Sequence, residues 1–425
     1  MRVAKSGKSV KMKKEEYKIH IIGAGVSGLV AAQVLELNGY HPVLIDASDR
    51  VGGRVKTDIV DGYQLDHGFQ VLLTAYPAAQ KYLDFDALEL QSFLPGATIF
   101  SNGNKKTIGD PLQDISLLLP TLFSGIGTIS DKVKILQLNG MLGQKQLSAV
   151  FEKPEKTTYA YLVDYGFSQE MINKFFKPFF SGIFLEPNLE TSSRMFEFVY
   201  KMFGEGPAKL PKAGIEAIPK QLKESLKQTT FLFNTKVKTV EEGKIFLTDG
   251  TEIESHNTII ATDASRLLTN LNNKETEWKS CETFYFETNT RTIKKPLIGL
   301  ITDKKALINN IFYHTSLKTK LVAAKELLSV TVVKKHGLST AALQSQIEKE
   351  LTQFCGIETL RCIKQYSIPR ALPKMQNLRY EMSPAETRLT KTIFLAGDMQ
   401  LNASLNAAMI SGERAGLGLV SALAE

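Results

Sequence analysis

The stretch that decides the fold is Ile19-His20-Ile21-Ile22-Gly23-Ala24-Gly25-Val26-Ser27-Gly28. An apolar strand over residues 18–22 leads into three glycines spaced G-x-G-x-x-G, and a helix-like segment follows them. Gly23 permits a sharp turn, Gly25 lets a pyrophosphate approach the backbone, and Gly28 lets the helix pack closely on the sheet. The pattern predicts a dinucleotide-binding strand–helix–strand unit.

The next segment adds a second strand and an acid. Val43-Leu44-Ile45 predicts a buried parallel strand, and Asp46 follows it, 18 residues after Gly28. A carboxylate near this spacing binds a ribose hydroxyl and disfavours a 2′-phosphate, which argues against NADP. The N–H groups at the start of the helix, at Val26 and Ser27, are expected to face the phosphates. These features do not distinguish an FAD site from an NAD site.

A second glycine turn, Gly52-Gly53-Arg54, favours FAD, because a simple NAD module has no evident use for it. The run Asp46-Ala47-Ser48-Asp49-Arg50-Val51-Gly52-Gly53-Arg54 resembles the D/E-A-x-x-R-x-G-G-R motif of the FAD-dependent amine oxidase, protoporphyrinogen oxidase and phytoene desaturase superfamily. The resemblance implies noncovalent FAD, contacted here by five residues: Asp46, Ala47, Arg50, Gly53 and Arg54.

Two segments extend the resemblance. Leu65-Asp66-His67-Gly68-Phe69-Gln70 resembles the D-x-G segment beside the flavin ring, which implies flavin contacts at Gly68, Phe69 and Gln70; a plain β-turn is the alternative. Strands are predicted over Phe231–Val240, Lys244–Thr248 and Thr251–Glu254, then over Thr258–Thr262. In the family the equivalent of Val237 contacts the adenine through its backbone.

The C-terminal segment supplies a second half of the site. Thr392–Asp398 predicts a buried strand that stops at Gly397-Asp398, and Asn406–Leu419 predicts a helix. The resemblance implies that Asp398 accepts hydrogen bonds from FAD hydroxyls. It also implies that the helix N-terminus near Asn406, Ala407 and Met409 lies at the N1–C2=O edge of the flavin, where it would stabilise negative charge.

The predicted fold class is therefore α/β. A discontinuous, Rossmann-like, glutathione-reductase-like FAD-binding domain is expected from residues 18–74, 205–265 and 388–425, and an α+β substrate domain of the amine oxidase type from 75–204 and 266–387. Residues 75–204 are expected to be rich in helix. For the aromatic run over Phe175–Pro187, core packing is expected rather than a place in the cavity wall.

Composition restricts the function classes. The 425 residues, 43% hydrophobic and 23% charged, fit two or three globular domains. The three cysteines, Cys281, Cys355 and Cys362, lack metal-ligand spacing, so no metal site is expected, and their low number favours a reducing, cytoplasmic setting. They are expected to be buried thiols.

The net charge of +8 does not indicate a nucleic-acid partner, because residues 1–18 alone carry +5 of it. Residues 1–17 are predicted to be a disordered basic tail, with Met12 as an alternative start. The tail has no apolar signal-peptide core, and no segment is predicted to span a membrane. Contact of the tail with an anionic membrane remains an alternative. A monotopic contact through the apolar run Leu117–Phe123 is another, although a buried helix end is expected there.

The predicted function is two-electron, hydride-type oxidation of an amine or of a C–C bond in a hydrophobic substrate, with transfer to oxygen or another acceptor. No motif identifies a catalytic residue, and His67, next to Gly68, is expected to be structural. Two alternatives stay open: a membrane-associated carotenoid or phytoene-type desaturase, and a non-catalytic protein like the Rab GDP-dissociation inhibitors, which bind lipidated partners. The Gly397-Asp398 pair counts against the second. The substrate and the oligomeric state are not predicted.

Overall fold

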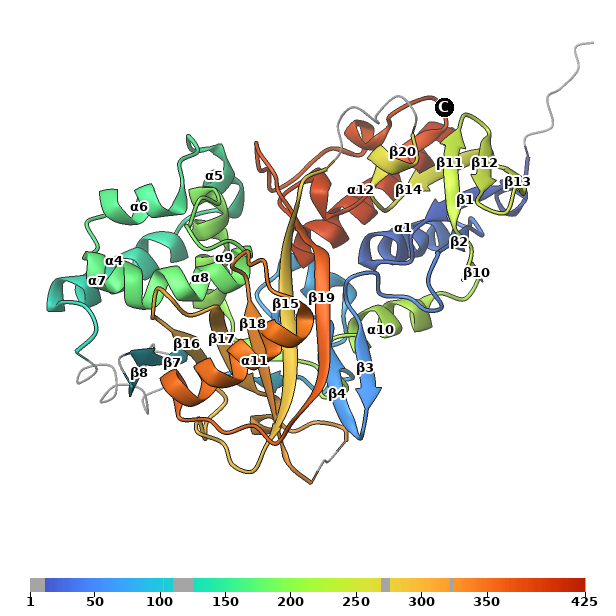
Figure 1. Ribbon diagram of the computed structural model, residues 1–425. Coiled ribbons are helices and arrows are strands. Elements are labelled where there is room, and N and C mark those ends of the chain that lie inside the picture. The colour runs from blue at the N-terminus through green and yellow to red at the C-terminus, as the bar shows by residue number, and fades with distance from the viewer. Residues whose placement is uncertain (1–11, 102, 110–124, 269–275, 322–323, 425) are drawn as a thin grey trace, which may run out of the picture.

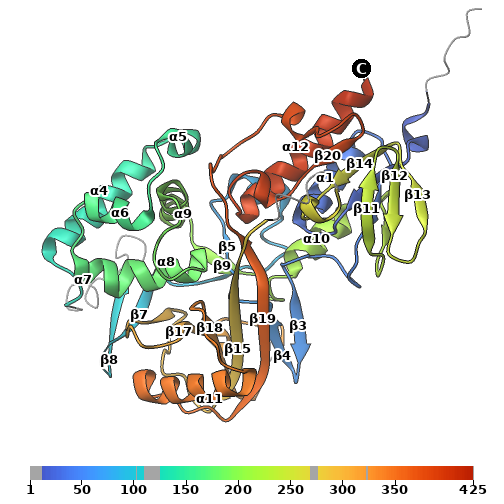
Figure 2. The ribbon, with the colours of Figure 1, turned by 45° about the horizontal axis from the view of Figure 1, so that its top comes forward.

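The computed structural model describes residues 12–101, 103–109, 125–268, 276–321 and 324–424. Figures 1 and 2 show three groups of elements around a common centre: a parallel sheet with its helices, a larger sheet with one covering helix, and a group of helices. Within the predicted tail, residues 1–11 lie outside the described residues. Lys14–Glu16 instead form a 3-10 turn, which is anchored where the Lys14 ammonium donates to the Asn38 carbonyl. The apolar run Leu117–Phe123 also lies outside the described residues.

The parallel sheet has five strands in the order β10-β2-β1-β14-β20. These strands span Thr230–Leu232, Val43–Ile45, Ile19–Ile22, Asn257–Ile260 and Ile393–Leu395, respectively. All four pairings are parallel, so the strands deliver their carboxyl ends to one edge. Segments from the beginning and the end of the chain therefore meet at that edge, as ligand-binding parallel sheets require.

Three helices belong to this sheet: α1 (Val26–Leu37), α10 (Ala217–Ser225) and α12 (Leu405–Ala424). Helix α1 follows β1 directly and packs against both of the others. A Cβ atom at Gly28 would lie 2.0 Å from the carbonyl oxygen of Gly23, and one at Gly412 would lie 2.2 Å from that of Ser27. Only glycine therefore permits this approach of α1 to the turn before it and of α12 to α1.

The predicted strand Phe231–Val240 is wrong as a single element. Strand β10 ends at Leu232 in the parallel sheet, and a new antiparallel sheet begins at β11 (Val237–Glu241), followed by β12 (Lys244–Leu247) and β13 (Glu252–Glu254). The chain turns between them through Asn234, whose φ of 52° breaks strand geometry. Asparagine tolerates this left-handed conformation better than most residues, and that was the available signal.

The larger sheet has seven strands in the order β19-β15-β18-β17-β16-β7-β8. They span Arg361–Pro373, Trp278–Thr288, Glu326–Val332, Ile308–Tyr313, Ile298–Ile301, Gly96–Ser101 and Asn104–Gly109, respectively. The expectation that residues 75–204 are rich in helix holds from Ile129 onward but is wrong over residues 96–109, where β7 and β8 form an edge hairpin of this sheet. Helix α11 (Thr340–Glu350) packs beside it, as Figure 2 shows.

The remaining helices form the third group. It comprises α4 (Ile129–Gly143), α5 (Leu147–Glu152), α6 (Thr158–Asp164), α7 (Gln169–Met171), α8 (Lys177–Phe184) and α9 (Ser193–Glu205). Three small elements link the groups: α2 (Pro77–Tyr82), the hairpin of β3 (Thr57–Val60) with β4 (Tyr63–Asp66), and the three short strands β5 (Leu72–Leu73), β9 (Ala208–Leu210) and β6 (Gln91–Ser92). Among the described residues, no helix is long and apolar enough to cross a bilayer.

Candidate functional site

A cavity of about 1900 Å³ extends from the carboxyl ends of the parallel strands to the helical group. Sites for one drug-sized ligand usually measure about 300–1,000 Å³, so this volume suits a cofactor together with a substrate. The cavity has two ends of different chemistry. We call them the glycine end, at β1, β2 and β20, and the aromatic end, at α8 and α9.

The glycine end gathers most of the predicted cofactor residues. Its lining includes Gly23, Gly25, Val26, Ser27, Asp46, Gly53, Arg54, Gly68, Phe69, Gln70, Gly397 and Asp398. The parallel sheet is what brings the first and last of these together, because β1 lies between β2 and β14, and β14 pairs with β20.

Gly25 forms a cradle in this wall. A Cβ atom there would meet no described atom within 4 Å, so the missing side chain leaves open cavity. The backbone of Gly25 is bridged to Gly52, and a Cβ at Gly53 would lie 3.3 Å from the Gly25 Cα, so two glycine turns hold the cradle's shape. Helix α1 begins at Val26 and presents its first N–H groups here, which suits a pyrophosphate.

Asp46 is held at the edge of the cradle by backbone groups. Its Oδ2 accepts from the Ala24 N–H at 2.6 Å, and its Oδ1 accepts from the Ser48 N–H at 2.8 Å. These contacts fix the carboxylate while it still lines the cavity. A carboxylate so fixed retains lone pairs that can accept from ribose hydroxyls.

Arg54 and Asp398 join the two halves of the glycine end. The guanidinium donates to Asp398 Oδ1 at 2.5 Å and lies 5.4 Å from the centre of the Trp278 ring. Burial lowers the pKa of Arg54, but the charge of Asp398 outweighs it and raises that pKa. Arg54 and Asp398 thus form an ion pair in the cavity wall, next to the cradle.

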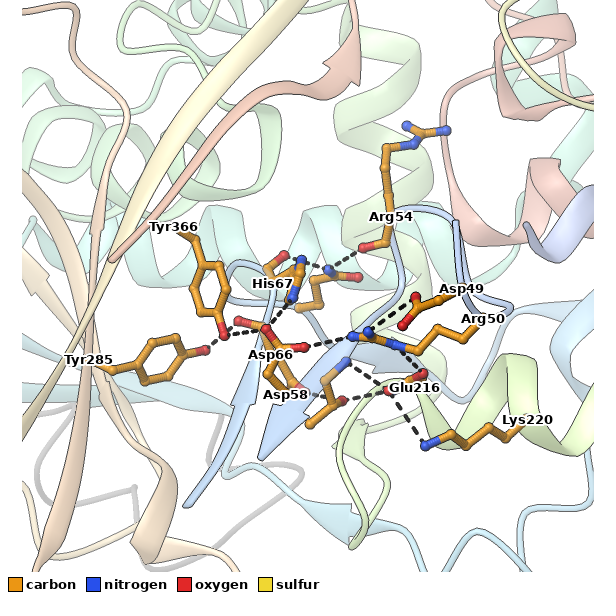
Figure 3. A network of polar contacts seen from close by, with 12 residues as sticks. Asp49, Arg50, Arg54, Asp58, Asp66, His67, Glu216, Lys220, Tyr285 and Tyr366 are labelled. Atoms are coloured by element: carbon orange, nitrogen blue, oxygen red, sulfur yellow. Dashed lines mark hydrogen bonds and ion pairs between the residues drawn. The ribbon is translucent and has the colours of Figure 1, made fainter. Parts of the chain in front are cut away.

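Several predicted residues lie outside the cavity lining. Arg50 points instead to Asp58 and Glu216, at 2.6 and 2.9 Å, whereas the guanidinium of Arg54 is turned away from that network in Figure 3. Gly28 is used in helix packing, as predicted for it. The others outside the lining are Ala47, Val237, Asn406, Ala407 and Met409. The start of α12 still reaches the cavity, through Leu405 and Ala408.

The segment after β4, residues 67–70, is tightly packed. Gly68 has a φ of 92°, and a Cβ there would lie 3.2 Å from the Ile368 side chain, so the chain turns here as only glycine does readily. The Phe69 ring lies 5.3 Å from that of Phe312. The Gln70 amide donates to the carbonyl oxygens of His67 and Arg54, which ties this segment to the second glycine turn.

Two carboxylates on the β3–β4 hairpin have opposite environments. Burial raises the pKa of Asp58, but hydrogen bonds from His67, Tyr366 and Arg50 outweigh it and lower that pKa to about 2. Burial raises the pKa of Asp66 to about 6, although Thr57 and the Ile215 N–H donate to it. Asp58 is therefore ionised at neutral pH, while Asp66 binds its proton more tightly than an ordinary aspartate does.

The aromatic end is built by α8, α9 and α4. Its lining includes Phe175, Phe179, Phe180, Ile183, Phe184, Met195, Val199, Tyr200, Phe203, Ile135 and Leu136. The expectation of core packing for the aromatic run holds for Phe176, which is fully buried, while Phe175 and Phe179 are partly buried against the same core and also line the cavity. Phe175 and Phe176 lie on a π-helical turn, Ile172–Phe176, which runs directly into α8. The rings of Phe176 and Phe180 pack on Phe196 of α9, whereas Phe175 and Phe179 face the cavity.

Sequence reasoning missed Lys279, which lines the cavity from β15. Its ammonium donates to Thr191 Oγ1 at 2.8 Å. Burial lowers the pKa of Lys279, with the charges of Glu186 and Glu190 opposing that effect. Its neighbour Cys281 also lines the cavity, and burial raises the pKa of this thiol to about 12. No group of His, Cys, Asp and Glu side chains suited to a metal ion occurs in the described part of the chain.

A family model described as "Flavin containing amine oxidoreductase" matches residues 26–416. L-amino acid oxidase Bs29 of Bothriechis schlegelii is 30% identical over 150 residues, which are 34% of this chain and 28% of that protein. Protoporphyrinogen oxidase 2, chloroplastic/mitochondrial, of Arabidopsis thaliana is 27% identical over 169 residues, 39% of this chain and 32% of that protein. The matches thus span less than a third of the length of these curated relatives.

The solved structure of a putative protoporphyrinogen oxidase from Exiguobacterium sp. 255-15 superposes with a TM-score of 0.69 at 17% identity, over 97% of this chain and 100% of that one. This likeness confirms the predicted fold class. The family match confirms the predicted family and, with it, the FAD cofactor. The cradle, the carboxylate at Asp46 and the volume of the cavity fit that cofactor.

Proposed function

Since the chain belongs to the family of flavin containing amine oxidoreductases, we propose that this FAD-dependent oxidoreductase removes a hydride from an amine or from a saturated carbon pair of a hydrophobic substrate. Oxygen or another acceptor then receives the electrons. The observation that carries the proposal is the continuity of the cavity: a glycine-lined end that suits a dinucleotide opens into an end lined by aromatic and aliphatic side chains.

The residues of the two ends have different proposed roles. Gly25 and the start of α1 would hold the pyrophosphate, and Asp46 would hold a ribose. Asp398 would accept from hydroxyls nearer the flavin, with Arg54 beside it. When bound, FAD supplies the two-electron acceptor. The apolar walls orient the substrate and exclude water, which keeps the reacting C–H bond in a dry environment.

An absorption spectrum and an anaerobic screen test this proposal. Purified protein should show flavin bands near about 380 and 450 nm. Amines, porphyrinogens and polyenes are then added without oxygen, and loss of the longer-wavelength band identifies a substrate class. Absence of bound flavin after FAD is supplied would refute the proposal. A flavin that none of them reduces, in a protein that binds a lipidated peptide, would favour the non-catalytic alternative.

A peripheral membrane contact, as in the desaturase alternative, is favoured by one surface. Helix α4 exposes an apolar stripe of Ile129, Val133 and Leu136, which are 83%, 47% and 50% exposed. Lys132 and Lys134 flank the stripe, and its acid, Asp131, is buried as a helix cap. Because Leu136 also lines the cavity, the stripe lies at a place where an apolar substrate could enter from an anionic lipid surface.

Co-sedimentation with vesicles tests this contact. The protein should bind vesicles containing an anionic phospholipid more tightly than neutral ones, and Ile129→Glu with Val133→Glu should abolish the binding. Leu360→Glu is the matched control, since Leu360 is 48% exposed and lies outside the cavity lining. Equal binding by the stripe variant and the control would exclude this surface.

A further inference from the structure

We propose that His67 is a catalytic proton acceptor, which takes up at Nδ1 the proton that leaves the substrate during its oxidation, and that Asp58 is its positioning residue. This inference rests on the proposed function. It gives a chemical role to a histidine that the sequence alone favours as structural.

The balance of the reaction requires such a group. When a saturated carbon pair becomes a double bond, one hydrogen leaves as hydride with the electrons of its C–H bond, and the neighbouring carbon loses a proton. When an amine becomes an imine, the nitrogen loses the proton. When bound, FAD would supply the hydride acceptor in both cases. The proton needs a base, and an apolar cavity offers little water to accept it.

His67 has the geometry of that base. It lines the cavity, and its side chain is 30% exposed. Its Nε2 lies 2.9 Å from Asp58 Oδ2 (Figure 3). Since the pKa of Asp58 is held near 2, its carboxylate accepts and Nε2 carries the hydrogen. The neutral ring then has its lone pair at Nδ1, and among the described residues no hydrogen bond occupies that atom.

Asp58 is in turn fixed from two sides. Tyr366 donates its hydroxyl to Asp58 Oδ2 at 2.8 Å, and Arg50 donates to Oδ1 at 2.6 Å. Arg50 is itself held by Glu216. The Tyr366 ring packs on the His67 ring, with centroids 4.5 Å apart. An imidazole held by an oriented carboxylate is the arrangement that stabilises an imidazolium as it forms.

The ionisable groups around the pair come from several elements. Asp58 and Arg50 lie on the side of β3, Asp66 follows on β4, and Glu216 lies at the start of α10. From the larger sheet come Tyr366, with the Lys364 ammonium over its ring, and Tyr285. Lys279 is a second nitrogen base in the cavity wall, but its ammonium donates to Thr191.

The first test reads the tautomer directly. The sequence contains six histidines, so the holoenzyme labelled with ¹⁵N-histidine gives a resolvable set of ring signals, and His67→Gln assigns the signal of His67. In the uncharged ring of His67 we expect the hydrogen on Nε2, and a loss of that preference in Asp58→Asn. A hydrogen found on Nδ1 would overturn the proposal, because that atom could not then accept a proton.

The second test uses nitroethane as a small probe, because its neutral form must lose a C–H proton before it can reduce a flavin, whereas its anion needs no base. Anaerobic flavin reduction by the neutral form should fall by about 10²–10⁴-fold in His67→Gln. Reduction by the anion should stay within about threefold, and Asp58→Asn should show a smaller loss of the same kind.

Tyr63→Phe should behave like the wild type with both forms. Tyr63 is a matched control because it lies on the same β3–β4 hairpin as Asp58 and also forms a hydrogen bond with a carboxylate. Its hydroxyl donates to Glu287. Retained reduction by neutral nitroethane in His67→Gln, or equal losses with both forms, would overturn the proposal. A protein that holds no FAD contradicts the proposed function instead, and the tautomer of His67 then still decides the geometry on which this inference depends.

Discussion

The two ends of the cavity are built in different ways. At the glycine end the wall is formed by the backbone, because Gly25 and Gly53 have no side chains and helix α1 presents its first N–H groups there. At the aromatic end the wall consists of side chains from α4, α8 and α9, which also pack the surrounding core. A backbone site requires particular residues at particular spacings, whereas an apolar wall requires only bulk. The glycine end is therefore predictable from the sequence, and the aromatic end is not.

The sharpest test of the glycine end compares two glycines of the same motif. Gly28→Val should prevent folding, because a Cβ there would lie 2.0 Å from a backbone oxygen and the cost should exceed about 4–5 kcal/mol. Gly25→Val should fold with a normal melting temperature and retain no FAD, because its side chain enters the open cradle. Soluble yield, thermal melting and flavin content measure both. Undiminished flavin in Gly25→Val would show that the cradle does not hold the cofactor.

At the aromatic end, stability and function should separate between neighbouring residues. Phe180 is 1% exposed, so Phe180→Ala should cost about 3–5 kcal/mol through the cavity that it leaves. Phe179 is only partly buried, and Phe179→Ala should cost less while weakening the binding of the substrate class found in the screen. Flavin content should not change in either variant. If Phe179→Ala released FAD, the two ends would not be independent.

The hairpin between the ends should give a pH-dependent signature. The pKa of Asp66 is raised from 3.8 to about 6, so the native state binds its proton more tightly than the unfolded chain does. Its stabilising contribution is full below about pH 4 and is lost as the pH rises through 6, by about 3 kcal/mol. Asp66→Asn should flatten thermal stability across that range.

Asp58→Asn should act in the opposite direction, since the lowered pKa of Asp58 stabilises the fold above about pH 4 and that stabilisation is lost toward pH 2. Melting temperatures of the two variants between pH 2 and 7 distinguish these slopes. Parallel curves would mean that the two carboxylates do not differ in environment.

The smallest expected effect concerns the join between the two halves of the glycine end. Asp398→Asn keeps the shape of the side chain but removes its charge and the ion pair with Arg54. A hydrogen bond to a charged group contributes about 1.5–3 kcal/mol, so the affinity for FAD should fall by about 10–100-fold. Titration of the apoprotein with FAD measures it. Unchanged affinity would remove Asp398 from the set of cofactor contacts.

The sequence predicted the central strands and both long helices of the parallel sheet because their glycines and apolar runs act locally. It did not predict that β10 leaves the meander, since Phe231 pairs with Leu44 nearly two hundred positions away. Nor did it predict β7 and β8, although Asn102-Gly103 is a turn signal, because β16, the strand that joins β7 to the sheet, is equally remote in the chain. Hydrophobic periodicity reports burial, not the identity of the covering element.

The same limit applies to side-chain chemistry. His67 was visible beside Gly68, but its partner Asp58 lies on the opposite strand and Tyr366 comes from the other sheet. Lys279 sits in a strand whose alternation resembles that of any half-buried strand. These residues can act together only because the fold brings distant segments into contact. Local patterns in a single sequence do not predict such contacts.

The ion pair between Arg54 and Asp398 spans 344 positions of the chain. At translation rates of about 5–20 residues per second, the ribosome adds Asp398 roughly 20–70 s after Arg54. During that interval the first strand–helix–strand unit has neither β20 beside its sheet nor α12 against its helix, so α1 keeps an uncovered face. With Asp398 as a cofactor contact, as proposed, FAD would bind late in biosynthesis, and the yellow colour of the flavin would report that the last strand and helix have docked.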